Sequence, residues 1–129
     1  MATGFPAATG DVLSAAMFNG LVSYTINTQS GATYTLASTD QYQVLVTTTN
    51  ASTKTVSIPT DATYAFPNGT AVTILNLGAG LLTVNAVTSG TTTVTSAGAV
   101  TASPTVAQYK TCVAIKTATN AWTVVGAVA

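Results

Sequence analysis

The sequence predicts an all-β fold, an antiparallel β-sandwich or barrel-like domain preceded by a short N-terminal arm and helix. From Val22 onward, apolar residues alternate with Thr and Ser at a period of two, which is the pattern of half-buried strands. Gly, Pro and Asn interrupt this pattern at a spacing typical of antiparallel sandwiches and barrels. The chain has 129 residues, enough for one domain with its own core, and 28 of them are Thr, whose branched side chain suits a pleated surface.

Residues 1–22 are predicted to form the arm and helix, and residues 23–129 the β domain. The first ten residues show no period, whereas residues 11–21 carry the only helical pattern, with Ser14 as a capping residue and Asn19-Gly20 as a stop. The apolar face of this helix consists of Leu13, Met17, Phe18 and Leu21. This face is about two turns long, and so short a helix is unstable alone, so it must dock onto something.

About eight or nine short strands are expected in the β domain. They lie within residues 24–26, 34–36, 41–49, 56–58, 71–77, 82–86, 93–96, 109–115 and 122–125. Gly78-Ala79-Gly80 separates two of them and predicts a hairpin turn. A phosphate-binding loop is the weaker interpretation of these glycines, because neither a helix pattern nor a Lys follows them.

The ionisable residues are too few for most kinds of chemistry. The chain has no Glu, Arg or His, and its charged side chains are three Asp and three Lys, with a net charge of zero. Acid–base and Ser-His-Asp catalysis, zinc and calcium sites, and phosphate-neutralising basic patches all need residues that are missing. No stretch approaches the roughly 18 consecutive apolar residues of a membrane helix. We therefore expect no enzyme activity, cofactor, metal, nucleic acid or membrane partner.

Two further residue types were weighed for a role. Cys112 lies in a strand pattern with no cation beside it, so it is expected to be a small buried hydrophobe rather than a reactive thiol. Tyrosines could form a carbohydrate-stacking platform, although aromatic packing is the favoured interpretation. The tyrosines concerned are Tyr24, Tyr34, Tyr42 and Tyr64.

The scarcity of charge also predicts assembly. A free globular protein usually keeps charged residues at about a quarter to a third of its surface, whereas only 5% of this chain is charged. Near-zero net charge promotes association, so we expect much of the surface to be covered by copies of the chain or by a partner. The alternative is a monomer kept dispersed by its Thr hydroxyl groups.

Two stretches resemble virion proteins of tailed bacteriophages. Residues 10–21, GDVLSAAMFNGL, resemble the segment GDVLTAAxxNxL found near the start of many such proteins. The later part is similar to a small β domain of phage head-decoration, head-fibre and tail-fibre proteins. The matching motifs lie at residues 34–36, 44–49, 55–59, 66–70, 74–80, 82–84 and 121–126.

This resemblance implies a non-enzymatic structural protein, commonly a homotrimer, attached to the virion through its N-terminal part with the β domain outward. The expected function is capsid decoration, in which the protein binds the major capsid protein on the outer surface of the head and stabilises the shell after synthesis in the host cytoplasm. Phe5, Pro6, Met17 and Phe18 are the expected docking residues. For Leu13 and Leu21, packing on the protein's own sandwich is the favoured interpretation.

The sequence is compatible with two other functions. A small head- or tail-fibre module would recognise a glycan or protein on the host surface instead of clamping the shell. A bacterial surface adhesion domain is disfavoured because residues 1–20 contain no Lys or Arg and do not resemble a secretory signal.

Overall fold

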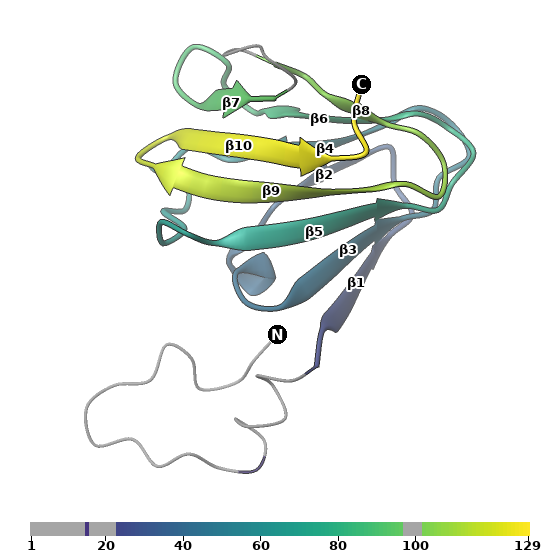
Figure 1. The fold of residues 1–129 in the computed structure, drawn as a ribbon, viewed down its shortest axis with the longest axis horizontal. Helices are drawn as coiled ribbons and strands as arrows, with labels where there is room; N and C mark the ends of the chain where they lie inside the picture. The colour runs from purple at the N-terminus through teal and green to yellow at the C-terminus, as the bar shows by residue number, and fades with distance from the viewer. Residues whose placement is uncertain (1–14, 16–22, 97–101) are drawn as a thin grey trace.

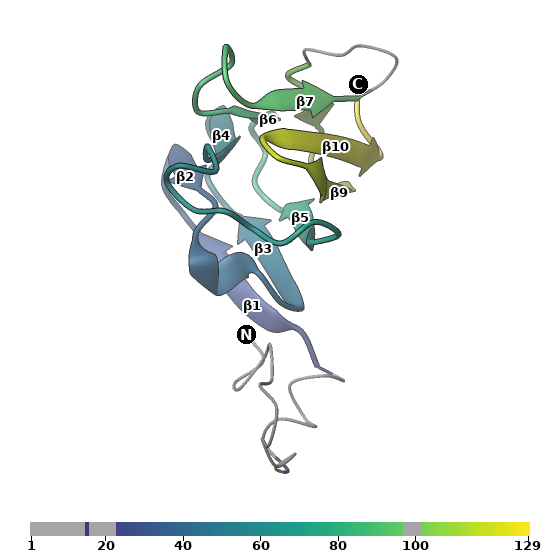
Figure 2. The same cartoon turned by 90° about the vertical axis from the view of Figure 1, so that its left-hand side faces the viewer.

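Two β-sheets face each other across a single core (Figures 1 and 2). The computed structural model describes residues 15, 23–96 and 102–129. Sheet A has the strand order β1-β3-β5-β9-β10-β7, and sheet B the order β2-β4-β6-β8. The elements are β1 (Thr25–Gln29), β2 (Thr33–Thr35), the 3-10 turn η1 (Ser38–Asp40), β3 (Val44–Thr48), β4 (Lys54–Ile58), β5 (Ala71–Asn76), β6 (Leu82–Ala86), β7 (Thr93–Thr95), β8 (Thr105–Val106), β9 (Thr111–Ala118) and β10 (Ala121–Gly126). The all-β prediction is confirmed, and the predicted helix at residues 11–21 lies outside the described residues except for Ala15.

The first six strands form three stacked coils. The chain passes alternately between the sheets, so β1, β3 and β5 enter sheet A while β2, β4 and β6 enter sheet B. Each strand from β3 to β6 pairs in parallel with the strand two places before it in the chain. Each coil thus contributes one strand to each sheet, as in a short two-sided β-helix.

The last four strands complete the sheets differently. The β9–β10 hairpin extends sheet A antiparallel to β5, β7 pairs in parallel with β10, and β8 pairs antiparallel with β6. Five of the eight strand pairings among the described residues are therefore parallel, so the sheets are mixed, and the antiparallel part of the prediction was wrong. The hairpin expected at residues 78–80 was also wrong, because this turn joins β5 of sheet A to β6 of sheet B. A period of two defines the faces of a strand but is the same in both pairing directions.

Equivalent inward positions of successive coils form apolar rows. In sheet A, Val46 pairs with Ile74 and Ile74 with Cys112, while in sheet B Val56 pairs with Val84. All five side chains are buried. In sheet B the positions between the buried residues carry hydroxyl or amide groups and point outward, which accounts for the alternation in those strands. In sheet A the corresponding outward positions include Leu45, Leu75 and Val113.

Aromatic rings close the core at one end. Tyr64 and Phe66, in the connection from β4 to β5, meet edge to face with ring centroids 4.6 Å apart. Phe66 meets Trp122 of β10 in the same way at 5.4 Å. This arrangement, favoured by the ring quadrupoles, fixes the long connection against the last strand of the hairpin.

Two glycines allow the turns of the second and third coils to stack closely. A Cβ on Gly78 would lie 2.0 Å from the Asn50 carbonyl oxygen, and one on Gly80 would lie 1.9 Å from that of Ser52. Real Cβ atoms cannot approach backbone so closely. The absence of a side chain at both positions therefore determines the spacing between these turns.

We expect Gly78→Ala and Gly80→Ala each to lower the free energy of unfolding by about 2–3 kcal/mol or more, because the added methyl group must push apart two backbone segments. Urea denaturation measures this change. The matched control is Gly90→Ala, since no atom lies within 4 Å of a Cβ there, and it should shift the free energy by less than about 1 kcal/mol. Equal stability of the Gly80 and Gly90 variants would contradict the close stacking.

Candidate functional site

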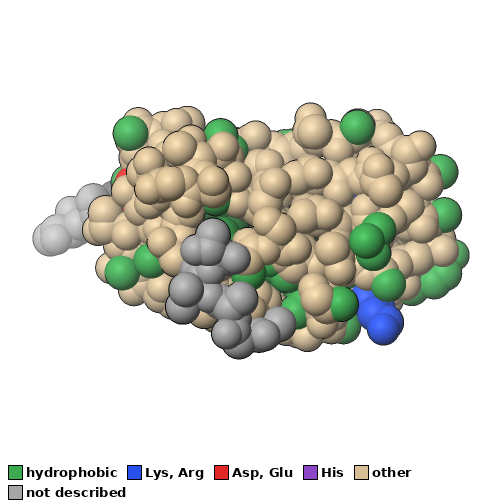
Figure 3. Space-filling view, turned by 90° about the horizontal axis from the view of Figure 1, so that it is seen from above, with side chains coloured by type: hydrophobic (Ala, Val, Ile, Leu, Met, Phe, Trp, Pro, Cys, Tyr) green, Lys and Arg blue, Asp and Glu red, His purple; other side chains and the backbone are tan. Residues whose placement is uncertain are grey.

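Most ionisable side chains of the described residues lie inside the protein. Asp40, Lys54 and Lys116 are 1%, 3% and 2% exposed, and the side chain of Asp61 is 17% exposed. Lys110 is the one Lys or Asp in the described ranges that is classed as exposed. Seen from above, the surface consists mainly of backbone and uncharged polar groups, with scattered hydrophobic side chains (Figure 3).

The described acidic and Cys side chains do not form a metal-binding cluster. In residues 23–96 and 102–129 together with Ala15, no three acidic, His or Cys side chains lie close enough to hold a metal ion. Within the same ranges, no helix is long and apolar enough to cross a membrane. The roles of the buried ions must therefore be sought in their local contacts.

Lys54 connects the second and third coils. Its Nζ donates hydrogen bonds to the carbonyl oxygens of Asn50 and Gly80, both at 2.7 Å. Asn76 donates to the same Gly80 oxygen at 2.9 Å and to that of Val106 at 2.9 Å. Burial lowers the pKa of the Lys54 ammonium, because a charged group loses its hydration there. The contacts identify Lys54 as a structural tie between turns.

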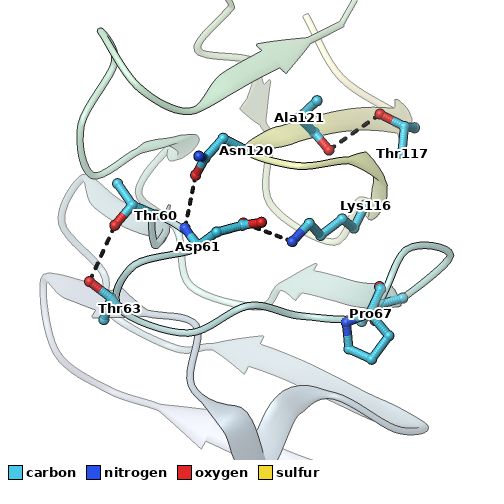
Figure 4. A network of polar contacts seen from close by, with 9 residues as sticks. Thr60, Asp61, Thr63, Pro67, Lys116, Thr117, Asn120 and Ala121 are labelled. Carbon is cyan, nitrogen blue, oxygen red and sulfur yellow. Dashed lines mark hydrogen bonds and ion pairs between the residues drawn. The ribbon is translucent and has the colours of Figure 1, made fainter.

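Lys116 and Asp61 form a second buried tie (Figure 4). The Lys116 Nζ lies 2.7 Å from an Asp61 carboxylate oxygen. The backbone N–H of Asp61 donates to the Asn120 side-chain oxygen at 2.8 Å. These contacts join the connection after β4 to β9 and to the β9–β10 turn. Because Lys116 occupies an inward position of β9, the ion pair compensates for burying its charge.

The first coil ends the apolar core with a polar layer. Asn27 pairs in register with Val46, and Tyr34 with Val56, so polar groups continue rows that are apolar in the later coils. The Asn27 side chain donates to an Asp40 carboxylate oxygen at 2.8 Å, and the Tyr34 hydroxyl donates to the other at 2.6 Å. Beside this layer is a hollow of about 460 Å³.

The polar layer is satisfied by its own members. Asp40 also accepts the backbone N–H of Ala37 at 2.9 Å, and the side-chain oxygen of Asn27 accepts from Gln29 at 2.6 Å. Burial, followed by the hydrogen bond to Asp40 and its charge, raises the pKa of Tyr34 to about 12. Such a layer caps the stack, as polar outer faces do in terminal repeats of solenoid proteins.

The outer face of sheet A, which faces the viewer in Figure 1, carries an apolar band. Ile26 and Val125 on this face are 57% and 45% exposed, and the other apolar members are partly buried. No Lys or Asp belongs to strands β1, β3, β5 or β10, and Lys116 of β9 points inward. The band consists of Ile26, Leu45, Leu75, Val113, Ile115 and Val125.

The outer face of sheet B has the opposite character. One cross-strand row contains Thr33, Thr55, Thr83 and Thr105, and the next contains Thr35, Ser57 and Asn85. A short hydrogen bond of 2.9 Å joins the Ser57 hydroxyl to Asn85. A face covered with hydroxyl and amide groups is suited to water, so the two outer faces differ in polarity.

The predicted docking residues and the predicted tyrosines have different outcomes. Phe5, Pro6, Met17 and Phe18 lie outside the described residues. Tyr34 and Tyr64 are partly buried and pack against the core, although Tyr34 also lines the hollow beside Asp40. Tyr42 is partly buried and Tyr24 is exposed. The structure favours aromatic packing over a carbohydrate platform.

The expectation for Cys112 is confirmed. This residue is buried in the core row, and burial raises the pKa of its thiol to about 12. The thiol is therefore protonated at neutral pH, and its contribution is that of a small apolar side chain.

Sequence reasoning missed the apolar band on sheet A, although a signal was present. Residues 44–46, 74–75, 113–115 and 124–125 are consecutive apolar residues within strands. Such runs are typical of strands with both faces covered, whereas a strand with one wet face alternates. The strands of sheet B alternate throughout.

Comparison with known proteins found no match: no protein-family model, curated protein or solved structure is significantly similar to this chain.

We expect the free energy of unfolding to fall between pH 10 and pH 12 through Tyr34. Its pKa rises from 10.0 to about 12 on folding, so the phenol ionises first in the unfolded chain. The contribution of the protonated Tyr34 phenol to the free energy of unfolding is fully present below pH 10 and is lost as the pH rises through 12. Tyr34→Phe should therefore show a shallower decline than the wild type in urea titrations over this range. Tyr109→Phe, which removes an exposed phenol, is the control and should keep the wild-type slope; a Tyr34→Phe slope equal to it would contradict the prediction.

Removing one partner of the buried ion pair should lower the free energy of unfolding more than removing both partners. We expect Asp61→Ala to lower the free energy of unfolding by about 2–4 kcal/mol, because it leaves the Lys116 ammonium unpaired in the interior. Adding Lys116→Met should restore most of this loss, since a chain of similar length then fills the site without charge. Thermal and urea denaturation of the two single variants and the double variant measure these changes. Lys110→Met, at an exposed position, is the control. Additive effects of the two substitutions would show that the pair is uncoupled.

Proposed function

We propose that the chain is a structural protein of a tailed-bacteriophage virion, a capsid decoration protein that binds the outer surface of the head as a homotrimer. Its resemblance in residues 10–21 and across the β domain supports the family. The observation that carries the structural role is the apolar, charge-free band on the outer face of sheet A. A domain that buries most of its ions while exposing such a band is suited to lasting contact with protein.

The proposed mechanism separates attachment from rigidity. Residues 1–22 come directly before β1, and their predicted docking side chains would bind the major capsid protein. The stacked coils, tied internally by Lys54 and by the Lys116–Asp61 pair, would supply a stiff body behind this attachment. Protein that binds only the intact shell stabilises it by mass action, so the binding free energy opposes rupture by the packaged DNA.

A head- or tail-fibre module is the second candidate. The hollow of about 460 Å³ beside Asn27, Tyr34 and Asp40 favours it, because amide, phenol and carboxylate groups are the kinds that bind sugars. Their bonds to one another leave fewer groups for a ligand, so decoration is preferred.

Immunogold electron microscopy of purified phage particles that contain this chain tests the location. We expect label over the head, and label confined to the tail would overturn the decoration role in favour of the fibre module. Heads stripped of the protein should release DNA at a lower temperature than native heads, and adding the recombinant chain should restore the native value. Restored binding without any gain in rupture temperature would contradict the stabilising role.

The attachment residues are tested in the same assay. The double variant Phe5→Ala/Phe18→Ala should bind stripped heads at least about tenfold more weakly, since large apolar anchors dominate docking interfaces. Thr33→Ala/Thr55→Ala on the outer face of sheet B is the matched control and should bind as the wild type does. Equal binding by both variants would contradict the assignment of residues 5 and 18.

A further inference from the structure

We propose that copies of this chain contact one another through the outer face of sheet A. The inference rests on the proposed function only in expecting a homotrimer, and it adds the surface that forms it. The starting observation is the contrast between the two outer faces of one domain.

Strand pairing places the apolar side chains side by side. Ile26 pairs with Leu45, Leu45 with Thr73, Thr73 with Val113, and Val113 with Val125. This register forms one continuous row across five strands, of which four members are apolar. The row crosses nearly the whole width of sheet A.

The flanking rows extend the same surface. On one side, Leu75 lies between Thr47 and Thr111, and on the other Ile115 lies between Ala71 and Thr123. Thr47 donates a hydrogen bond to the Thr28 hydroxyl at 3.0 Å, so this pair is partly satisfied within the face. The polar side chains of these three rows are all Thr, so they are uncharged.

The size of this face suits a protein contact. Five strands spaced about 4.8 Å apart, with about five residues each at about 3.3 Å, give a footprint of about 400 Å². This footprint includes the Thr side chains between the apolar ones, and it is as large as the largest apolar patch of a typical single chain, about 300–600 Å², which is often functional. Scattered apolar residues need no such explanation, but a continuous row over five strands does.

Charge identifies a second copy as the occupant. Sheet A presents no ionised side chain on its outer face, so two or more copies can meet there without desolvating an ion or opposing like charges. The whole chain has a net charge of zero, which removes long-range repulsion between copies. Three such faces turned toward a common axis would cover one another, while the hydroxyl-rich faces of sheet B remained in water.

The register supplies a matched pair of variants for the test. Leu45→Lys/Val113→Lys places two ammonium groups on sheet A, separated by one strand. Thr33→Lys/Thr83→Lys places two on sheet B with the same separation, because Thr55 lies between them as Thr73 lies between the first pair. The two variants thus carry the same charge on opposite faces.

Sedimentation velocity and native mass spectrometry of the full-length chain measure the oligomer over a range of concentrations. We expect an oligomeric wild type, a sheet A variant whose dissociation constant rises at least about a hundredfold, and a sheet B variant like the wild type. Circular dichroism verifies folding. Should the Lys variant fail to fold, Val113→Thr/Val125→Thr retains the branched shape and should also weaken association.

Other outcomes overturn the inference. A wild type that stays monomeric at all concentrations, or an oligomer unaffected by the sheet A substitutions, would contradict it. A dimer that is lost in the sheet A variant would uphold the contact face and contradict the proposed trimer. Gold label absent from phage heads would overturn the decoration role without affecting the contact face.

Discussion

The parallel stacking of three coils is the constraint on which the rest of the structure depends. Once β3 lies beside β1 and β5 beside β3, each inward position must suit the one above and below it, which produces the pairs Val46–Ile74 in sheet A and Val56–Val84 in sheet B. The same stacking brings backbone into contact at the turns, where only glycine fits at positions 78 and 80. It also leaves carbonyl groups facing inward, and Lys54 and Asn76 satisfy them. Core, turns and buried polar groups are thus consequences of one arrangement.

The alternating pattern from Val22 onward predicted the all-β class, and most strands formed near the expected residues, because the burial of every second side chain is a local property. Pairing direction was not predictable in this way. Val72, Ile74 and Asn76 face inward whether β5 lies parallel or antiparallel to its neighbour, and the distinction depends on the path of residues 49–53 and 77–81 between sheets. The sequence identified Gly78 and Gly80 as a turn signal. Their close approach to Asn50 and Ser52 could not be predicted, because it joins residues 28 apart in the sequence.

The charge-poor exterior was predictable from composition, whereas the polar layer and the apolar band depend on contacts between residues far apart in the sequence. Composition predicted an exterior poor in charge, and the positions of Asp40, Lys54 and Lys116 make it poorer still, because these ions lie inside. Their partners could not be predicted, since Asp40 meets Asn27 and Tyr34 only after β1, β2 and η1 come together. The apolar band needed both the consecutive apolar residues in the sequence and the register that aligns them across sheet A.

The distribution of polarity runs against the usual one, and this inversion links the fold to assembly. Charged groups normally oppose aggregation at the surface and are excluded from the core. Here the buried ions stabilise turns and loops, while the exposed sheet edges and faces carry hydroxyl groups or aliphatic side chains. Hydroxyl groups on the outer face of sheet B make that face compatible with water. Because they are uncharged, they do not repel another chain electrostatically. The aliphatic face of sheet A gains free energy only when it is covered, at roughly 25 cal/mol for each Å² removed from water. Covering this face with other protein would therefore lower the free energy of the chain, whereas covering the outer face of sheet B would remove hydroxyl and amide groups from water.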